Sequence, residues 1–303
     1  MDTNIIRNIF IFNSAIILFI GLLINLFESH LPILIKRMYL YGKFGIKTPH
    51  QKASTKFEVP KRWFKHFYIV CAPVLAIALC LILYKYLYNG DVPEIVLTLL
   101  DMLLGESRKP LISAEDAILA LVVFSMHCWK RAYETFYVSV FSDQKMNILH
   151  YVVAHIHYIG LTLCIIGETE GFVKDSHGDV FLHKITPIKL VCALICLWSS
   201  YMQLKTNFIL AKLRKNTHGD IVSLEHKIPS DGLFKYIAGP LQLCEILIYS
   251  MLSVILWQAS TYHYVTLWVI ANQVECAFLS HQWYRKTFKN YPKERKILLP
   301  YIW

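Results

Sequence analysis

Long apolar runs separated by polar stretches dominate the chain. Seven runs are long enough to cross a bilayer as helices, which takes roughly 20 residues each. They cover residues 4–27, 63–88, 116–141, 146–167, 187–210, 236–258 and 262–280. A shorter apolar run, residues 92–104, contains two acidic residues and indicates an interfacial helix. The pattern predicts an all-α, multi-pass membrane bundle of about seven transmembrane helices with a short interfacial helix.

The polar stretches alternate between basic and acidic. Residues 30–65 carry nine Lys or Arg against one acid, residues 211–235 five against three, and residues 281–303 six against one. Residues 89–115 carry two against five, and residues 168–186 two against four. Because basic loops remain on the cytosolic side of a membrane, we expect a lumenal or external N-terminus and a cytosolic C-terminus. The first run has little positive charge before it and no small-residue cleavage site after it, so we expect it to be a membrane helix rather than a cleaved signal.

The composition supports a membrane protein. Of 303 residues, 55% are hydrophobic and only 17% are charged, whereas a soluble domain carries about 25% charged residues. The net charge of +10 is explained by cytosolic loops beside anionic lipid and by an anionic cofactor. The sequence has no soluble domain with a basic patch, so we do not expect nucleic-acid binding. No repeat, GxGxxG or Walker motif is visible, so we expect a single membrane domain over residues 1–303 without a Rossmann domain.

The eight cysteines all lie inside apolar runs and form no CxxC pair. This placement is typical of small buried hydrophobic residues rather than of a metal site, so no metal is expected.

The segment FSMHCWKRAYETFYVSVF, residues 124–141, has ionisable residues at membrane depth. His127, Arg131 and Glu134 follow a spacing of 0, +4 and +7, which puts them on one helix face, and Lys130 is four residues before Glu134. A buried ionisable group costs at least ~2.5 kcal/mol on insertion scales and therefore indicates function. We predict catalytic roles for His127, Arg131 and Glu134. The alternative is an ion pair that locks two helices together.

Polar residues also lie in the cytosolic halves of other predicted helices, which suggests a pocket open to the cytosol and to lipid. They are His66, Gln203, Lys205, Asn207, Glu245, Glu275, His281 and Tyr284.

Two stretches resemble a known family. The C-terminal SHQWYRKTFKNYPKERKILLPYIW and the stretch NFILAKLRKNTHGD…HKIPSDGLFKYIAGP…CE resemble the signature of the steroid 5α-reductase family. The pieces VPKRWFKHFY, KRAYETFYVSVFSD and FLSHQWY resemble the branch of that family that saturates polyprenoids. The resemblance covers residues 59–303.

The resemblance implies an enzyme of the endoplasmic reticulum membrane that uses NADPH. It would saturate the isoprene unit beside the alcohol end of a long-chain polyprenoid and so supply dolichol for protein N-glycosylation. Its partners would be the polyprenoid and membrane lipid, with no nucleic acid, metal or obligate protein partner.

The resemblance also implies a cofactor site built mostly from residues 200–303. Arg214 matches the family's phosphate-contacting Arg, and we assign the basic residues 36–65 to lipid headgroups instead. The full set of expected cofactor-binding residues is Lys205, Asn207, Arg214, His226, Glu245, His281, Tyr284 and Lys296. Leu241 departs from the family, which usually has Asn at that position.

The donor to the substrate oxygen also departs from the steroid-reducing members, which use a Glu and a Tyr. The corresponding positions here are near His66 and at Cys128, so His66 and His127 are the candidate donors. The alternative is that both are capped histidines near the membrane interface.

Hydride transfer needs an electron-poor carbon, which an isolated alkene lacks. An aldehyde conjugated with the alkene supplies one, and a donor can then stabilise the developing enolate. We therefore expect the aldehyde, rather than the alcohol, to react.

Other classes remain open. A related reductase of steroids or enoyl thioesters would share the family motifs, and a membrane isoprenyl methyltransferase has a similar basic, aromatic C-terminal region. A receptor or transporter with seven spans would consume no NADPH.

Overall fold

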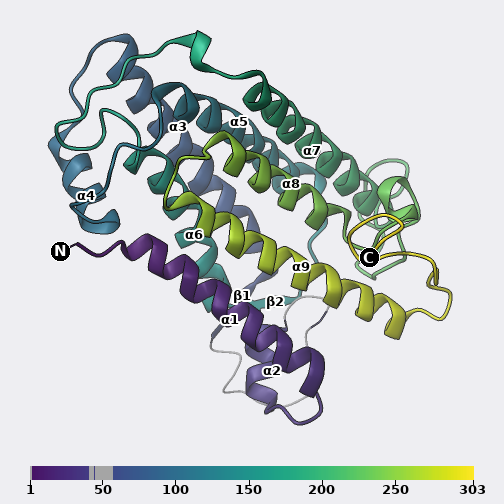
Figure 1. The fold of residues 1–303 in the computed structure, drawn as a ribbon. Helices are drawn as coiled ribbons and strands as arrows, with labels where there is room; N and C mark the ends of the chain where they lie inside the picture. Colours follow the sequence, from purple (N-terminus) through teal and green to yellow (C-terminus); the bar gives the residue numbers. More distant parts are fainter. Residues whose placement is uncertain (1, 41–43, 45–56) are drawn as a thin grey trace.

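The computed structural model describes residues 2–40, 44 and 57–303, which form a bundle of long helices with one small sheet (Figure 1). The all-α fold predicted from the apolar runs is confirmed, and no Rossmann domain occurs among these residues. Half of residues 36–65, which were assigned to lipid headgroups, lie outside the described residues, namely 41–43 and 45–56. The elements are α1 (Ile5–Phe27), α2 (Ile33–Tyr39), β1 (Glu58–Pro60), η3 (Lys61–Phe64), α3 (Lys65–Leu87), α4 (Glu94–Leu104), α5 (Ala114–Tyr133), η4 (Glu134–Val138), β2 (Lys145–Asn147), α6 (Ile148–Gly167), η5 (Leu182–Lys184), α7 (Pro187–Lys212), η6 (Gly232–Lys235), α8 (Pro240–Ile255) and α9 (Tyr262–Thr287).

Each of the seven predicted spans corresponds to a helix, but the helices differ in how apolar they are. Within the described part of the chain, four are long and apolar enough to cross a membrane: α1, α3 together with η3, α6 and α7. Helix α8 is apolar but has only 16 residues. Helices α5 and α9 are 20 and 26 residues long, and polar side chains interrupt their apolar sequences. The chain is therefore a multi-pass membrane protein in which α5, α8 and α9 pack among more apolar helices.

Helices α1 and α9 run side by side in the same direction (Figure 1). At their first turns, Asn4 Nδ2 donates to Thr261 Oγ1 at 2.8 Å. Near the other end of α1, Asn25 Nδ2 lies 3.2 and 3.1 Å from the two carboxylate oxygens of Glu275. The two termini lie at opposite ends of the bundle (Figure 1). Parallel first and last long helices are consistent with an odd number of crossings.

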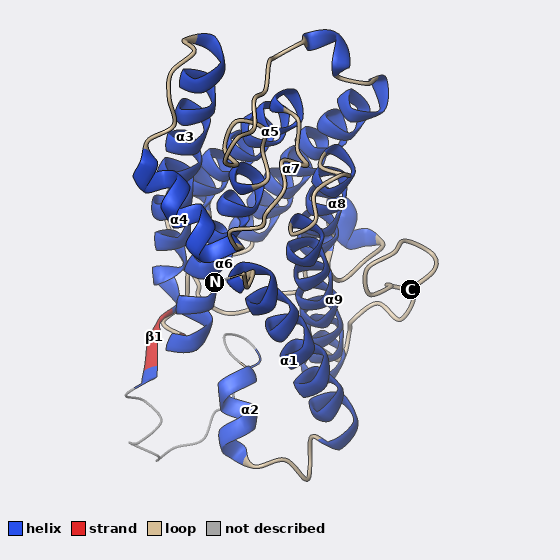
Figure 2. Ribbon diagram, turned by 60° about the vertical axis from the view of Figure 1, so that its left-hand side comes forward, coloured by secondary structure: helices blue, strands red, loops and turns tan. Residues whose placement is uncertain are grey.

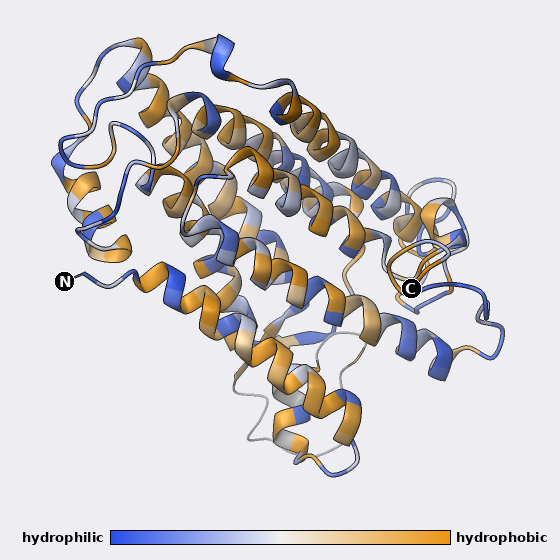
Figure 3. Ribbon diagram, in the orientation of Figure 1, coloured by the Kyte–Doolittle hydropathy of each residue, from blue (hydrophilic) through white to orange (hydrophobic). Residues whose placement is uncertain are grey.

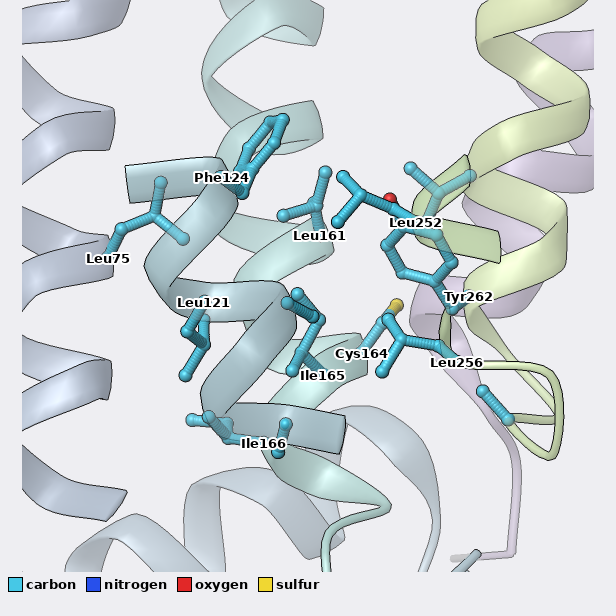
Figure 4. Packing of buried hydrophobic residues seen from close by; sticks show 14 of the residues in the cluster. Leu75, Leu121, Phe124, Leu161, Cys164, Ile165, Ile166, Leu252, Leu256 and Tyr262 are labelled. Carbon is cyan, nitrogen blue, oxygen red and sulfur yellow. The ribbon is translucent and has the colours of Figure 1, made fainter. Parts of the chain in front are cut away.

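A small sheet and an apolar core hold the bundle together. Strands β1 and β2 are antiparallel, with Val59 opposite Met146, and they join the beginnings of α3 and α6; Figure 2 shows β1 beside the start of α3. The core between α3, α5, α6, α8 and α9 includes fully buried Leu75, Phe124 and Leu161 (Figure 4). In Figure 3, hydrophobic residues cover most of the helices, and the carboxyl end of α9 is hydrophilic.

A buried carboxylate fixes the start of α9. Glu168, at the end of α6, is 2% exposed. Its Oε1 atom accepts hydrogen bonds from the hydroxyls of Ser260 and Thr261 at 2.6 and 2.5 Å. The backbone N–H of Ser260 donates to Oε2 at 2.7 Å. All these donors lie just before α9, where a negative charge also complements the helix dipole.

Candidate active site

Helix α5 changes its winding just after Lys130 and Arg131. After Tyr133 it continues as a π-helical turn, η4, which the N–H of Ser139 closes by donating to the Glu134 carbonyl at 2.8 Å. Such turns are rare and often occur at functional sites. His127 and Arg131 face the interior of the bundle, whereas Trp129 is 54% exposed on the outer surface. The segment singled out in the sequence therefore turns its ionisable residues inward.

Glu134 is the centre of a buried charged cluster and has no exposed surface. Arg131 Nη1 and Asn207 Nδ2 both donate to its Oε2 atom, the latter at 3.0 Å. Lys130 Nζ lies 3.2 Å from Glu134 Oε1 and donates to Gln203 Oε1 at 2.6 Å. Two of these partners belong to α7, so the cluster joins α5 to α7. Arg131 and Glu134 pair within one helical segment, and the links between helices come from Asn207 and Gln203 on α7.

Arg131 also joins α5 to α3. Its Nε atom donates to Tyr68 Oη at 3.0 Å, and its guanidinium carbon lies 4.9 Å from the Tyr68 ring centroid. Tyr68 is 1% exposed. The guanidinium is therefore held by a carboxylate on one side and an aromatic side chain on the other, which fixes its orientation.

His127 and Glu245 form a second part of this interior. The Nε2 atom of His127 lies 3.5 Å from Glu245 Oε2 on α8, and its Nδ1 atom lies 3.0 Å from Ser200 Oγ on α7. Phe124 stacks on the imidazole with ring centroids 5.6 Å apart. Glu245 Oε2 is buried and has no hydrogen-bond partner among the described residues. At 3.5 Å the His127 imidazole is beyond ordinary hydrogen-bond distance from this oxygen, which can therefore still accept from a ligand's donor group.

Cys128 follows His127 and faces a different neighbour. Its sulfur lies 3.2 Å from the sulfur of Cys71 on α3, and both are free, buried thiols. No hydroxyl is offered at this position, so Cys128 cannot replace the Tyr of the steroid-reducing members.

A second cluster lies at the end of α7 beyond the membrane helices. Arg214 Nη1 donates to the Val140 carbonyl at 2.8 Å, and Nη2 lies 2.9 Å from His226 Nδ1. Burial of the guanidinium lowers the pKa of Arg214, and the nearby Tyr284 phenol opposes that shift. An arginine remains charged at neutral pH, so this cluster is cationic.

Tyr284 belongs to an aromatic layer that the C-terminal segment completes. The rings of Tyr284 and Tyr291 stack with an interplanar angle of 2° and centroids 5.5 Å apart. His281 Nδ1 lies 3.2 Å from Tyr291 Oη. Arg295 packs over Tyr291 at 5.1 Å and is 4% exposed. Its Nε and Nη1 atoms have no hydrogen-bond partner within the described part of the chain.

The segment after Tyr291 is fixed by pairing with the start of α8. The N–H of Lys296 donates to the Tyr236 carbonyl, and its own carbonyl accepts from Ala238, both at 2.8 Å. Gly239 permits close packing here, since a Cβ atom there would lie 3.3 Å from the Ile297 carbonyl oxygen and 2.8 Å from the Cβ of Ala277 on α9. The pairing brings the C-terminal segment into the same cluster as Arg214 and Tyr284.

The two clusters are connected through α7. Asn207 contacts Glu134 in the interior, and Arg214 follows seven residues later at the end of the helix. At 1.5 Å per residue this separation is about 10 Å. The polar residues therefore form one path from the bundle interior to its C-terminal end.

Three expected site residues lie apart from these contacts. His66 Nδ1 is 3.1 Å from Tyr151 Oη on α6, away from His127. Lys205 is exposed and lies over the ring of Tyr201 at 4.8 Å. Lys296 reaches the cluster through its backbone, which pairs with Tyr236 and Ala238.

Several residues of the site were not among those expected from the sequence. Tyr68 and Ser200 contact Arg131 and His127 across helix interfaces, and no local pattern indicates such partners. Gln203 was noted only as polar, although its four-residue spacing from Asn207 already places both on one face of α7. Arg295 lies in the basic C-terminal run, where composition does not distinguish a buried arginine from exposed lysines.

Comparison with known proteins identifies the family. The sequence profile described as 3-oxo-5-alpha-steroid 4-dehydrogenase matches residues 144–303. The polyprenal reductase of Drosophila melanogaster is 31% identical over 99% of this chain and 93% of its own length. The polyprenal reductase of Caenorhabditis elegans is 34% identical over 95% and 94%, and that of Homo sapiens 30% identical over 86% and 84%. The chain therefore belongs to the 3-oxo-5-alpha-steroid 4-dehydrogenase family, whose members are oxidoreductases that act on a CH–CH group and use a nicotinamide cofactor.

Proposed function

We propose that the chain is an NADPH-dependent polyprenal reductase that saturates the double bond next to the aldehyde and yields dolichal. The observation that carries this proposal is the approach of His127 to Glu245, at 3.5 Å, inside a bundle that is apolar elsewhere. The names of the relatives that match nearly the whole chain support the choice of substrate. The product would supply dolichol for protein N-glycosylation.

The residues present fit a phosphorylated nicotinamide cofactor. Glu245 Oε2 has only the more distant His127 imidazole beside it, at 3.5 Å, and the Nε and Nη1 atoms of Arg295 have no acceptor among the described residues. Arg214 adds a second cation at that end, and Arg is well suited to phosphate because its donors are arranged as a fork. When bound, NADPH would supply a hydride. Glu245 would orient the amide-bearing end, with Asn207 nearby, and Arg214 with Arg295 would hold phosphate.

His127 is the donor that this arrangement favours for the substrate oxygen. It lies beside Glu245, the proposed contact for the reacting end of the cofactor, whereas His66 faces Tyr151. Its Nδ1–H, exchanging Ser200 Oγ for the substrate, would donate a hydrogen bond to the aldehyde oxygen, where negative charge collects as the far carbon is reduced, while Nε2 stays beside Glu245. Glu245 would stabilise positive charge on that imidazole. Arg131, Lys130 and Glu134 would keep the site rigid rather than exchange protons.

The remaining expected contacts extend this proposal toward the cytosol. His281 and Tyr284 would line the passage between the reacting end and the phosphates, and His226 would hold Arg214 in place. Lys205 and Lys296 would add positive charge at its edge. Most of these residues belong to residues 200–303, within a single domain formed by residues 1–303.

The membrane setting suits a substrate that cannot leave the bilayer. A long polyprenoid would keep its tail in lipid while its aldehyde enters the polar interior between the helices. We place the enzyme in the endoplasmic reticulum membrane with the N-terminus lumenal and the C-terminus cytosolic, which gives the cationic end of α7 access to cytosolic NADPH.

The test uses the purified chain in lipid nanodiscs with NADPH and either polyprenal or polyprenol. Saturated product should form from polyprenal alone, at a rate that His127→Gln lowers by about 100-fold or more, since one positioned donor is worth about 10²–10³ in rate. His66→Gln is the matched control and should retain most of the rate. Equal reduction of the alcohol, or a larger loss with His66→Gln, would reject the assignment. A steroid enone in a parallel reaction tests the related reductases.

A further inference from the structure

A buried tyrosine–histidine pair lies one helical turn beyond Glu245. The Oη atom of Tyr249 on α8 is 2.7 Å from the Nε2 atom of His157 on α6. The two side chains are only 3% and 5% exposed, so they meet inside the bundle, where a polar group without a partner is costly. With the imidazole donating from Nε2, the phenol keeps its own O–H proton for another acceptor. The pair is therefore a buried proton donor separate from His127.

Tyr249 faces the same interior as His127. Glu245 and Tyr249 are four residues apart and so lie on one face of α8, and Glu245 is the residue that approaches His127. Phe124 contacts both rings: it stacks on His127 with centroids 5.6 Å apart and meets Tyr249 edge to face with centroids 5.5 Å apart. At 1.5 Å per residue, Tyr249 is about 6 Å further from the start of α8 than Glu245. It therefore lies near His127 and deeper in the bundle than Glu245.

Aromatic packing holds His157 in this pair. Its ring centroid lies 4.6 Å from that of Trp268 on α9, and it meets Phe10 of α1 edge to face at 6.0 Å. Its Nδ1 atom is buried and has no hydrogen-bond partner within the described part of the chain, so its polar contact there is the one to Tyr249. A hydrogen bond to the charged form of a group favours that form. His157 is therefore placed to stabilise the phenolate that remains after Tyr249 has given up its proton.

Saturation of an enal needs a proton as well as a hydride. The hydride adds to the β-carbon, the alkene electrons move toward the aldehyde oxygen, and an enolate results. The enolate then takes a proton at its α-carbon, where a new C–H bond forms. His127 is assigned to the oxygen, so another group must supply this proton. Because the oxygen and the α-carbon are separated by a single carbon, that group must lie close to His127.

We propose that Tyr249 protonates the α-carbon of the substrate and that His157 positions the Tyr249 hydroxyl. The proposal rests on the proposed reduction of polyprenal. The Tyr249 O–H bond breaks as the enolate electrons form the new C–H bond and the aldehyde is restored. The Nε2–H of His157 donates to the phenolate oxygen, and water replaces the phenol proton between turnovers. Tyr249 is thus the catalytic residue, and His157 acts only through it.

The first measurement is the rate at which the full chain in nanodiscs forms dolichal from polyprenal and NADPH. Tyr249→Phe should lower kcat about 100-fold, because a positioned general acid contributes about 10²–10⁴ in rate, and the KM values should stay nearly the same. Tyr262→Phe is the matched control, since it also removes a phenol hydroxyl from the buried core, and it should retain the rate. An unchanged kcat in Tyr249→Phe would overturn the proposal.

Deuterium incorporation tests the same step in the unmodified chain. In D2O, deuterium should enter one face of the α-carbon only, as measured by NMR after borohydride has trapped the product as the alcohol. An equal mixture of the two faces would mean that the enol leaves the site and is protonated by solvent, which contradicts a role for Tyr249. Tyr249→Phe should give such a mixture in the product that it still forms, and a loss of stability alone would not. Labelling of one face by this variant would likewise reject the proposal.

Two substitutions of His157 test its positioning role. The amide of His157→Gln can donate to Tyr249 as the imidazole does, so this variant should keep most of the rate and label one face. His157→Leu cannot donate, so its kcat should fall about tenfold, as expected for loss of one hydrogen bond to a charged group, and the share of deuterium on the second face should rise. His155→Leu is the matched control, because the His155 Nδ1 atom contacts the Tyr151 carbonyl of its own helix at 2.8 Å. Equal losses in the two His157 variants would refute the positioning role.

The same preparations separate failure of this proposal from failure of the proposed function. Dolichal formation by the unmodified chain, together with an unchanged Tyr249→Phe variant, overturns only the role of Tyr249. If the unmodified chain forms no dolichal from polyprenal and NADPH, the polyprenal reductase assignment is wrong and the role of Tyr249 falls with it.

Discussion

Substitution of Glu134 by Gln tests whether the charged cluster holds the bundle together. The carboxylate is fully buried and is contacted by three donor side chains, those of Lys130, Arg131 and Asn207. Gln has nearly the same shape but no charge, so the substitution removes electrostatic stabilisation without creating a cavity. Lys130 and Arg131 would then be two buried cations with only neutral partners, apart from the more distant Glu245.

The magnitude follows from the three contacts. A hydrogen bond to a charged group is worth about 1.5–3 kcal/mol, against about 0.5–1.5 kcal/mol for a neutral one. The difference is about 1 kcal/mol per contact, so three contacts give about 3 kcal/mol, at the lower end of the cost of about 3–5 kcal/mol for breaking a buried ion pair. At about 2–4 °C per kcal/mol, the unfolding midpoint should fall by roughly 6–12 °C.

The assay is thermal unfolding of the purified variants in one nanodisc preparation, with Glu245→Gln as the matched control. Glu245 is a partly buried acid whose Oε2 atom faces the His127 imidazole at 3.5 Å, a longer contact than those made by Glu134. Its replacement should lower the midpoint by only about 2 °C, as expected for about 1 kcal/mol or less, while raising the KM for NADPH. A Glu134→Gln midpoint equal to that of the unmodified chain, or a larger fall for Glu245→Gln, would refute this account of the cluster.

Three further substitutions test individual contacts. Gly239→Val places a side chain against Ala277 and should lower cofactor affinity by about tenfold or more through displacement of the C-terminal segment, measured by calorimetry; unchanged affinity would contradict the close approach. Glu168→Gln should destabilise the fold by about 2 kcal/mol, because hydrogen bonds from buried donors lose their charged acceptor, and thermal unfolding in nanodiscs measures this loss. Tyr68→Phe removes one hydrogen bond to Arg131 but keeps the ring, so the unfolding midpoint should fall by about 2–4 °C, corresponding to about 1 kcal/mol; Tyr68→Ala should lower it further.

The positions of the helices could be predicted from the sequence because long apolar runs have few alternatives in a bilayer. Helical spacing also placed Arg131 and Glu134 close together, and they are in contact. The same spacing separates Lys205 from Asn207, since two residues apart means opposite sides of a helix. The exposed position of Lys205 therefore follows from helical periodicity. It was grouped with Gln203 and Asn207 only because all three are polar.

The contacts between helices could not be predicted in this way. The partners of Arg131 and His127 on α3 and α7 depend on how the helices pack, which the pattern of each helix does not determine. Lys61 was grouped with lipid-facing basic residues because the two short strands leave no clear pattern. The pairing of β1 with β2 places its backbone N–H within 2.9 Å of the Gln144 carbonyl.

The pairing of α1 with α9 has a consequence for biogenesis. Helix α1 is long and apolar enough to cross a membrane, so it can reside in lipid as soon as it is synthesised. Its partner is made much later, since Asn4 and Thr261 are 257 residues apart, and α9 carries Glu275 near its middle. Insertion of an unpaired glutamate into lipid is unfavourable. The hydrogen bond from the Asn25 amide to Glu275 lowers this cost. Helix α1, which is inserted first, can therefore assist the later insertion of α9 by offering a polar partner within the membrane.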